Sequence, residues 1–238
     1  RIQKRYYAID ENGQVSHNNA QLTAEAVEEL CDADFTVQDI ELLSCGTSSP
    51  DQILPSHTAM VHGYLKNRTM EINSASGACC SGMNALKYGY MSVKTGQVAN
   101  AVCAGSERTS SWMKSDVFEN EVEHLQELET SPILAFNKEF LRWMLSDGAG
   151  AFLLENEPNG ETPLKIEWIQ GFSYAHEMET CMYAGGEKLE SGQLKPWSEY
   201  PAKKWGKMSL FAMKQDTRLL GENILQKGVA SLKLAYEN

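Results

Sequence analysis

Short apolar segments of strand character alternate with helix-type segments between residues 22 and 169 of the 238-residue chain. Strands are predicted where apolar residues run into turn residues or alternate with polar ones, at 40–47, 70–76, 101–104, 149–154 and 164–169. Helices are predicted from helix formers, from a proline at a first turn and from apolar spacing, at 22–30, 57–65 and 80–96. Because apolar strands that alternate with helices favour a layered sheet with parallel pairing, this order predicts an α/β fold.

The last part of the chain has a different character. Residues 173–207 are rich in Gly, Glu and Lys and show no periodicity, so we expect an irregular excursion there. A final helix is predicted at about 209–235, with Met213, Leu220 and Ile224 on one stripe. We therefore expect a core at about 1–172 that is followed by the excursion and this helix.

The composition excludes several classes of protein. A net charge of −11 argues against a general nucleic-acid binder and against a polybasic membrane adaptor. The sequence has no apolar run long enough to span a membrane and no secretion signal near Arg1–Arg5. Six cysteines without a CxxC pair predict neither a disulfide scaffold nor a metal site, and they favour a reducing compartment, the cytoplasm. Cys31, Cys45 and Cys103 lie in apolar runs and are expected to be small buried hydrophobic residues.

The segment 72–108 contains the candidate catalytic residues. A predicted strand passes through small residues to Cys79 and Cys80 and then directly into the amphipathic helix. The N–H groups and the positive end of the dipole at a helix N-terminus favour thiolate over thiol, so a cysteine there is a candidate nucleophile. The alternative is a buried strand-to-helix turn with two incidental small hydrophobic residues, and spacing alone leaves both interpretations open.

Four blocks of the sequence carry a resemblance to a known family. Ala78-Cys79-Cys80-Ser81-Gly82-Met83 resembles the nucleophile motif of the ketoacyl-ACP synthase III branch of the thiolase superfamily, in which Cys-Ala/Ser-Gly opens a buried helix. Three other blocks are similar in the same order: the strand ending at 47–49 with the helix start at 55–56, residues 95–107, and residues 146–151. Arg1–Arg5 is similar to a basic stretch near the start of such enzymes. The resemblance implies a thiolase-like fold in which 1–238 is an incomplete N-terminal domain, the first half of a duplicated layered α-β-α fold with a mixed sheet.

The resemblance also implies an activity. The family's nucleophile is followed by Ser-Gly or Ala-Gly, which assigns the role to Cys80 and places Cys79 where a small Ala usually stands. The implied reaction is a decarboxylative Claisen condensation through an acyl-Cys intermediate, in fatty acid or related acyl biosynthesis. Acyl-CoA and malonyl-ACP would be substrates, with the backbone N–H of Cys80 as half of an oxyanion hole. The resemblance implies no cofactor and no metal, an acyl carrier protein as partner, and a homodimer formed through the sheet edge beside the nucleophile.

The sequence departs from the family pattern in two respects. The family uses a His and an Asn from the second half of the fold, and none of the five histidines here lies in a matching motif: His17, His57, His62, His124 and His176. Met83 also replaces a common Phe. We therefore expect a fragment of a longer protein. The alternatives are a non-catalytic condensing-enzyme-like partner subunit of a heterodimer, and a thiol-based redox or binding protein that uses Cys79 and Cys80.

The remaining polar residues are expected to be structural. His57 and His62 are five residues apart, which does not suit a metal-binding helix face, and His176 is expected at the surface. Asp147 is interpreted as a turn residue rather than an acid, and Gly148 and Gly150 as turn and packing residues. Basic residues concentrate near the end of the chain and predict a solvated helix face, with docking of an acidic carrier protein as the alternative: Lys203, Lys204, Lys207, Lys214 and Arg218.

Overall fold

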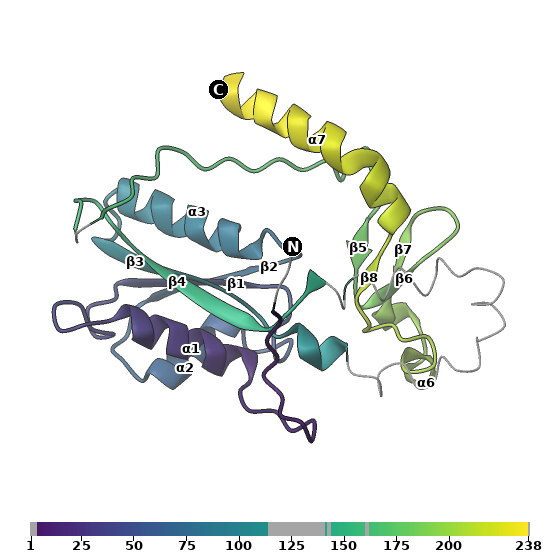
Figure 1. Ribbon diagram of the computed structural model, residues 1–238, viewed down its shortest axis with the longest axis horizontal. Helices are drawn as coiled ribbons and strands as arrows, with labels where there is room; N and C mark the ends of the chain where they lie inside the picture. The colour runs from purple at the N-terminus through teal and green to yellow at the C-terminus, as the bar shows by residue number, and fades with distance from the viewer. Residues whose placement is uncertain (1–3, 114–140, 142–143, 160–161, 238) are drawn as a thin grey trace. The chain divides into compact units, whose positions relative to one another are not determined.

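The structure is a computed structural model that describes residues 4–113, 141, 144–159 and 162–237 (Figure 1). The chain divides into two compact units, residues 1–110 with 146–169 and residues 111–145 with 170–238. Each unit is described by itself.

In the described part of the first unit, four strands form one mixed sheet in the order β2-β1-β3-β4. The strands are β1 (Leu42–Thr47), β2 (Glu71–Ser76), β3 (Asn100–Glu107) and β4 (Gly148–Glu155). β1 pairs parallel with β2 and β3, and β4 pairs antiparallel with β3. The expectation of an α/β fold with a mixed sheet is confirmed.

Helices cover both faces of this sheet (Figure 1). α1 (Asn19–Leu30) and α2 (His57–Leu65) lie on one face, and α3 (Ser81–Lys94) lies on the other. Leu43 packs in the core cluster that contains residues of α1 and α2, whereas its neighbour Leu42 packs in the cluster that contains Val93 of α3. All of β1 is buried because successive side chains of a strand point to opposite faces and both faces are covered.

Local signals set the ends of these helices. α1 begins at a capping box formed by Asn18 and Gln21. α2 begins after Ser56, whose side chain accepts a hydrogen bond from the N–H of Ala59, and it ends at Lys66 with a φ of 51°. The predicted helix at 57–65 is thereby confirmed, and the one predicted from residue 80 begins at Ser81.

The prediction of a strand at 164–169 is wrong. These residues form neither helix nor strand, and Leu164 is 91% exposed. An alternating pattern produces a strand only where a neighbouring strand is available for pairing, and no described strand pairs with this segment.

The second unit contains short elements that the sequence pattern did not reveal. β5 (Met182–Tyr183) pairs with β8 (Lys214–Gln215), and β6 (Gly186–Lys188) pairs with β7 (Leu194–Pro196). The short helices η3 (Trp197–Glu199) and α6 (Ala202–Trp205) follow β7.

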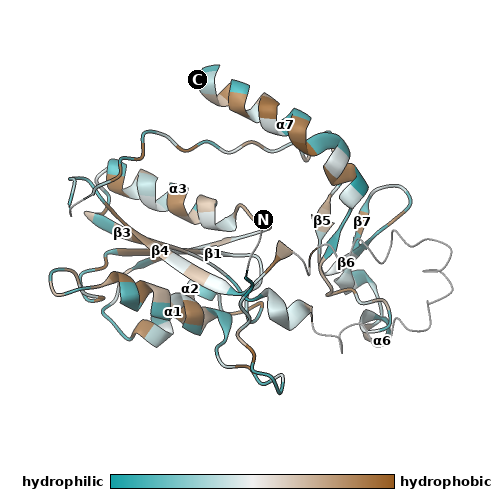
Figure 2. Ribbon diagram, in the orientation of Figure 1, coloured by the Kyte–Doolittle hydropathy of each residue, from teal (hydrophilic) through white to brown (hydrophobic). Residues whose placement is uncertain are grey.

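The last helix, α7 (Thr217–Glu237), begins eight residues later than expected, because residues before it form β8. Met213 therefore lies outside the helix. Hydrophobic and hydrophilic residues are mixed along α7 (Figure 2), and no residue of α7 is buried. Among the described helices, none is both long and apolar enough to cross a membrane.

Candidate active site

The two adjacent cysteines lie in the tight turn between β2 and α3. β2 ends at Ser76, and Gly77 follows with a φ of 134°, a backbone conformation that residues other than glycine rarely adopt. The N–H of Ser81 donates to the carbonyl of Ala78 at 3.0 Å, which closes the turn. Cys79 and Cys80 are both exposed, with Cys80 as the N-cap residue of α3. The expected strand–turn–helix arrangement around the thiols is therefore present.

Glycines let the start of α3 lie directly against the sheet. A Cβ on Gly46 of β1 would overlap the Ser81 carbonyl and would lie 2.6 Å from the backbone nitrogen of Gly82. A Cβ on Gly105 of β3 would lie 3.5 Å from the Cα of Gly82, which is an ordinary contact. The backbone of α3 therefore approaches β1 more closely than any residue with a side chain at position 46 would allow.

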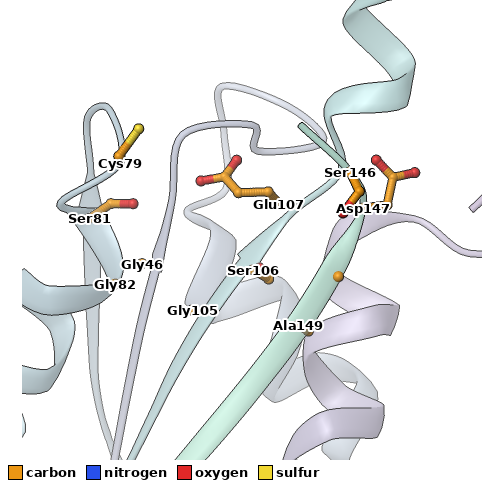
Figure 3. Close-up of a pocket in the computed structure, with 11 residues that line it drawn as sticks. Gly46, Cys79, Ser81, Gly82, Gly105, Ser106, Glu107, Ser146, Asp147 and Ala149 are labelled. Carbon is orange, nitrogen blue, oxygen red and sulfur yellow. The ribbon is translucent and has the colours of Figure 1, made fainter. Parts of the chain in front are cut away.

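A depression of about 430 Å³ opens beside this helix start (Figure 3). Its walls come from the ends of β1 and β3, the turn before α3 and the turn before β4. The lining residues are Gly46, Cys79, Ser81, Gly82, Gly105, Ser106, Glu107, Ser146, Asp147, Gly148 and Ala149. The pocket thus brings three of the sequence blocks together. Cys79 is among its lining residues, whereas Cys80 lies one position further along and is not.

The start of α3 has the electrostatic character that suits an anion. Cys80 makes no side-chain capping hydrogen bond, and the first N–H groups of a helix have no acceptors within the helix itself. These N–H groups and the helix dipole stabilise negative charge, on a thiolate or on the oxygen of a thioester carbonyl under attack.

Glu107 is a site residue that the sequence analysis missed. Its carboxylate accepts hydrogen bonds from the N–H of Ser48 at 2.8 Å and from the hydroxyl of Ser49 at 2.6 Å. These bonds hold the side chain in a fixed orientation, and the carboxylate points toward the wall that carries Cys79 and Ser81 (Figure 3). Its position within the block at residues 101–107 was the available signal, because that block ends at the carboxyl edge of a parallel strand.

Asp147 has a structural role that is broader than the expected turn. Its carboxylate accepts hydrogen bonds from the N–H groups of Ala8, at 2.7 Å, and Ser110, at 2.9 Å. Its own N–H donates to the carbonyl of Tyr6 at 2.7 Å. The buried Asp147, just before β4, therefore connects the N-terminal segment with the 3-10 helix η1 (Thr109–Trp112) that follows β3.

The histidines do not form a metal site in the described part of the chain. His57 is buried, and its Nε2 lies 3.1 Å from Ser106 Oγ and 3.2 Å from Thr23 Oγ1. Burial lowers the pKa of His57, and the nearby Asp51 and Glu107 oppose this shift. Among the described residues, no cluster of three or more potential metal-binding side chains exists.

None of the other described histidines is among the residues that line the pocket. His62 is not part of the His57 cluster, and its Nε2 lies 3.2 Å from the carbonyl of Arg68. His17 pairs with Glu25 at 3.0 Å, and His176, as expected, is exposed. His124 lies outside the described residues.

The terminal basic residues do not form a single solvated face. Lys203, Lys204 and Lys207 are exposed, as is Arg218. Lys214, however, is buried, forms an ion pair with Glu187 and belongs to β8 rather than to a helix. The expectation of a common helix face is therefore wrong for Lys214, because strand pairing with β5 draws it into the second unit.

Comparisons with known proteins agree on one class of enzyme. The profile of the family "Beta-ketoacyl synthase, N-terminal domain" matches residues 53–159. The chain is 31% identical over 102 residues to β-ketoacyl-ACP synthase III 2 of Vibrio vulnificus, which is 42% of this chain and 28% of the relative. It is 30% identical over 110 residues to β-ketoacyl-ACP synthase III of Clostridium perfringens, 46% of this chain and 32% of the relative.

A solved structure extends the likeness in fold to nearly the whole chain. AbyA1, a tetronic acid condensing enzyme, superposes with a TM-score of 0.65 at 15% identity and covers 96% of this chain. The matched part is 61% of the AbyA1 chain, and the matches to both synthases cover less than a third of those relatives.

Proposed function

From the membership of this chain in the thiolase superfamily, as a ketoacyl-ACP synthase III-like condensing enzyme, we propose that it is an acyltransferase with Cys80 as the nucleophile. The observation that carries the proposal is the pair of exposed thiols at the uncapped start of α3, beside a pocket lined by Gly46, Gly82 and Gly105. The choice of Cys80 rests on the Ser-Gly that follows it. It does not rest on the pocket, because Cys79, and not Cys80, is among the lining residues.

The proposed first step is transfer of an acyl group to Cys80. The thiolate sulfur forms a bond to the carbonyl carbon of an acyl-CoA or acyl-carrier-protein thioester. The bond from that carbon to the departing thiolate breaks, and that thiolate takes up a proton. The backbone N–H of Cys80 and the positive end of the α3 dipole stabilise the oxyanion during this attack, because both favour negative charge at the helix start.

The proposed second step forms the carbon–carbon bond. Malonyl-ACP loses CO2, and the resulting carbanion attacks the acyl carbon while the electron pair of its bond to sulfur returns to Cys80. The product is a 3-oxoacyl thioester of fatty acid or related acyl biosynthesis. No His or Asn is among the residues that line the described pocket, so we assign the acyl-transfer step to this chain and the complete reaction to the whole protein.

The proposal extends to partners and compartment. We propose acyl carrier protein and acyl-CoA as partners and a homodimer that forms through β2, an edge strand of the sheet in the described first unit. The six cysteines of the described residues are all free, which supports a reducing compartment such as the cytoplasm.

Intact-mass analysis after incubation with acyl-CoAs of several chain lengths tests this function. We expect one acyl adduct on the wild-type chain, lost in Cys80→Ser and retained in Cys79→Ser. Cys181→Ser serves as a matched control at a partly buried thiol and should keep the adduct.

Two results would contradict the proposal. An adduct that persists in Cys80→Ser would assign the nucleophile to another residue. A wild-type chain that takes up no acyl group from any thioester would favour the non-catalytic partner subunit instead.

A further inference from the structure

Two of the six cysteines differ from the rest in their surroundings. Burial raises the pKa of Cys45 and of Cys103 to about 12. Burial also raises the pKa of Cys31 and Cys181, whose sulfurs lie 3.3 and 3.4 Å from backbone carbonyls. Cys79 and Cys80, in contrast, are both exposed. Oxidants therefore meet the adjacent pair before they meet the other four thiols.

The spacing of the pair determines what kind of disulfide it could form. Consecutive Cα atoms are about 3.8 Å apart across a trans peptide, which is shorter than the usual separation of about 4.4–6.8 Å in a disulfide. A bond between adjacent cysteines is therefore strained. Strained and exposed disulfides are easily reduced, and such bonds serve as reversible switches rather than as structural links.

The turn that carries the pair has room to adjust. Gly77 has a φ of 134°, and a Cβ built on it would meet no atom within 4 Å. Cys80 is the N-cap residue of α3 and makes no side-chain capping hydrogen bond that would have to break. The adjustable backbone of residues 77–80 thus lies outside the close contact of Gly46 with the backbone of Ser81 and Gly82.

We propose that Cys79 and Cys80 form a peroxide-sensitive dithiol that closes reversibly into a disulfide. The thiolate of one cysteine attacks the peroxide oxygen and becomes a sulfenic acid, and the peroxide is reduced to water or to its alcohol. The neighbouring thiol then attacks the sulfenic sulfur, the S–S bond forms, and the hydroxyl leaves as water. Two protein hydrogens and two electrons are thus lost to one peroxide. An external dithiol restores the reduced form by exchange.

This site has a consequence for catalysis that rests on the proposed function. Cys80 in the disulfide has no thiolate to accept an acyl group, and Cys79 lines the pocket beside it. Oxidation would therefore stop acyl transfer reversibly. It would also protect the nucleophile, because a sulfenic acid that condenses with a neighbouring thiol escapes the irreversible sulfinic and sulfonic states.

The test treats the reduced chain with hydrogen peroxide, removes the peroxide and measures the intact mass under denaturing conditions. The expected change is a loss of the mass of two hydrogen atoms, with two fewer thiols open to iodoacetamide. Peptide mapping should place the bond within 79–80, a non-reducing gel should show no covalent dimer, and dithiothreitol should restore the mass.

Variants separate the pair from the other cysteines. Cys79→Ser and Cys80→Ser should each lose the two-hydrogen change and instead gain oxygen atoms that dithiothreitol does not remove completely. Cys31→Ser and Cys181→Ser should behave as the wild type. Oxidation of the wild type to oxygen adducts alone, or a disulfide that involves any other cysteine or a second chain, would overturn the inference.

The same samples separate this inference from the proposed function. A chain that forms the disulfide but accepts no acyl group would contradict only the acyl-transfer proposal. A chain that accepts an acyl group on Cys80 but never forms the disulfide would contradict only the redox proposal.

Discussion

At the scale of single residues, His57 shows how a buried polar side chain links separate elements of the first unit. Its ring joins α2 to Thr23 of α1 and to Ser106 of β3 through Nε2. The ring is buried in the core, where a positive charge on a protonated histidine would be poorly solvated. The protonation state of His57 therefore affects the stability of the unit.

We predict that His57 makes folding stability fall at acidic pH. Burial lowers the pKa of His57 below the ordinary 6.5, so the unfolded chain binds this proton more readily than the folded chain does. The contribution is complete above pH 6.5 and is lost as the pH falls toward the folded-state pKa. Urea unfolding at a series of pH values should show a shallower decline below pH 6.5 for His57→Gln than for the wild type.

His176→Gln is the matched control, because it removes an exposed histidine. Its decline with pH should follow that of the wild type. If His57→Gln shows the same slope as the wild type, His57 does not contribute to the pH dependence.

The sequence alone identified the site residues that belong to a contiguous motif. It missed the residues whose role depends on contacts between distant parts of the chain. The motif around Cys79 and Cys80 is contiguous, so the chain order alone reveals a thiol at a helix start. The role of Glu107 depends on Ser48 and Ser49, which lie close to it only after the sheet has formed. The Asp-Gly turn pattern likewise does not predict the two hydrogen bonds that the Asp147 carboxylate accepts from backbone N–H groups.

At the scale of elements, the site depends on how closely the start of α3 approaches β1. Residue 46 is a glycine, and a Cβ at this position would overlap backbone atoms of Ser81 and Gly82. Backbone atoms cannot rotate away as a flexible side chain can. The placement of both cysteines relative to the pocket therefore depends on Gly46.

We predict that Gly46→Ala lowers the free energy of unfolding by about 1–3 kcal/mol, the usual cost of overpacking a filled core. It should also slow acyl transfer, since the start of α3 has to move away from the sheet. Denaturant unfolding followed by circular dichroism measures the first effect, and the rate of adduct formation measures the second.

Gly150→Ala is the control for this prediction. Gly150 belongs to β4 of the same sheet, and a Cβ there would meet nothing within 4 Å. This variant should unfold within about 0.5 kcal/mol of the wild type, as changes away from packed positions usually do. Equal loss of stability in both variants would mean that close packing at Gly46 is not the cause.

Element boundaries followed local signals where those signals were strong. Ser56 and Lys66 delimit α2, and its bounds agree with the prediction. The start of α7 was misplaced because apolar spacing continues backward through residues that in fact pair with β5. The alternation at 164–169 is insufficient to make a strand for a related reason, since pairing partners are a property of the tertiary fold.

At the scale of the whole molecule, β2 is the element that the proposed dimer would use. β2 lies at an edge of the described sheet and alternates between exposed and partly buried residues. Ile72 on this edge strand is 38% exposed. An edge strand with an exposed apolar residue is a surface on which a second copy can continue the sheet.

We predict that Ile72→Lys weakens the proposed dimer, because a charge on an edge strand opposes strand pairing. Analytical ultracentrifugation should show a dimer for the wild type and an increase of more than about tenfold in Kd for the variant, equivalent to ~1.4 kcal/mol. Leu164→Lys places the same charge at an exposed position outside the sheet and should leave the dimer intact. A monomeric wild type, or equal weakening by both variants, would contradict the use of β2.

The organisation of the whole chain was predictable only in part. The α/β class and the mixed sheet followed from the order of segments and from the resemblance. The division into two units did not, because the second unit combines segments from both sides of residues 146–169, which belong to the first unit. Such contacts between distant segments leave no periodic signal in the sequence.

The most direct test of the account is to locate the acyl group itself. After brief incubation with an acyl-CoA, proteolysis and fragmentation of the peptide that spans residues 71–87 should place the acyl group on the sulfur of Cys80. The buried Cys45 and Cys103 should remain unmodified in the same digest. An acyl group found on Cys79 or on any residue outside this peptide would contradict the central claim that the start of α3 presents Cys80 as the nucleophile.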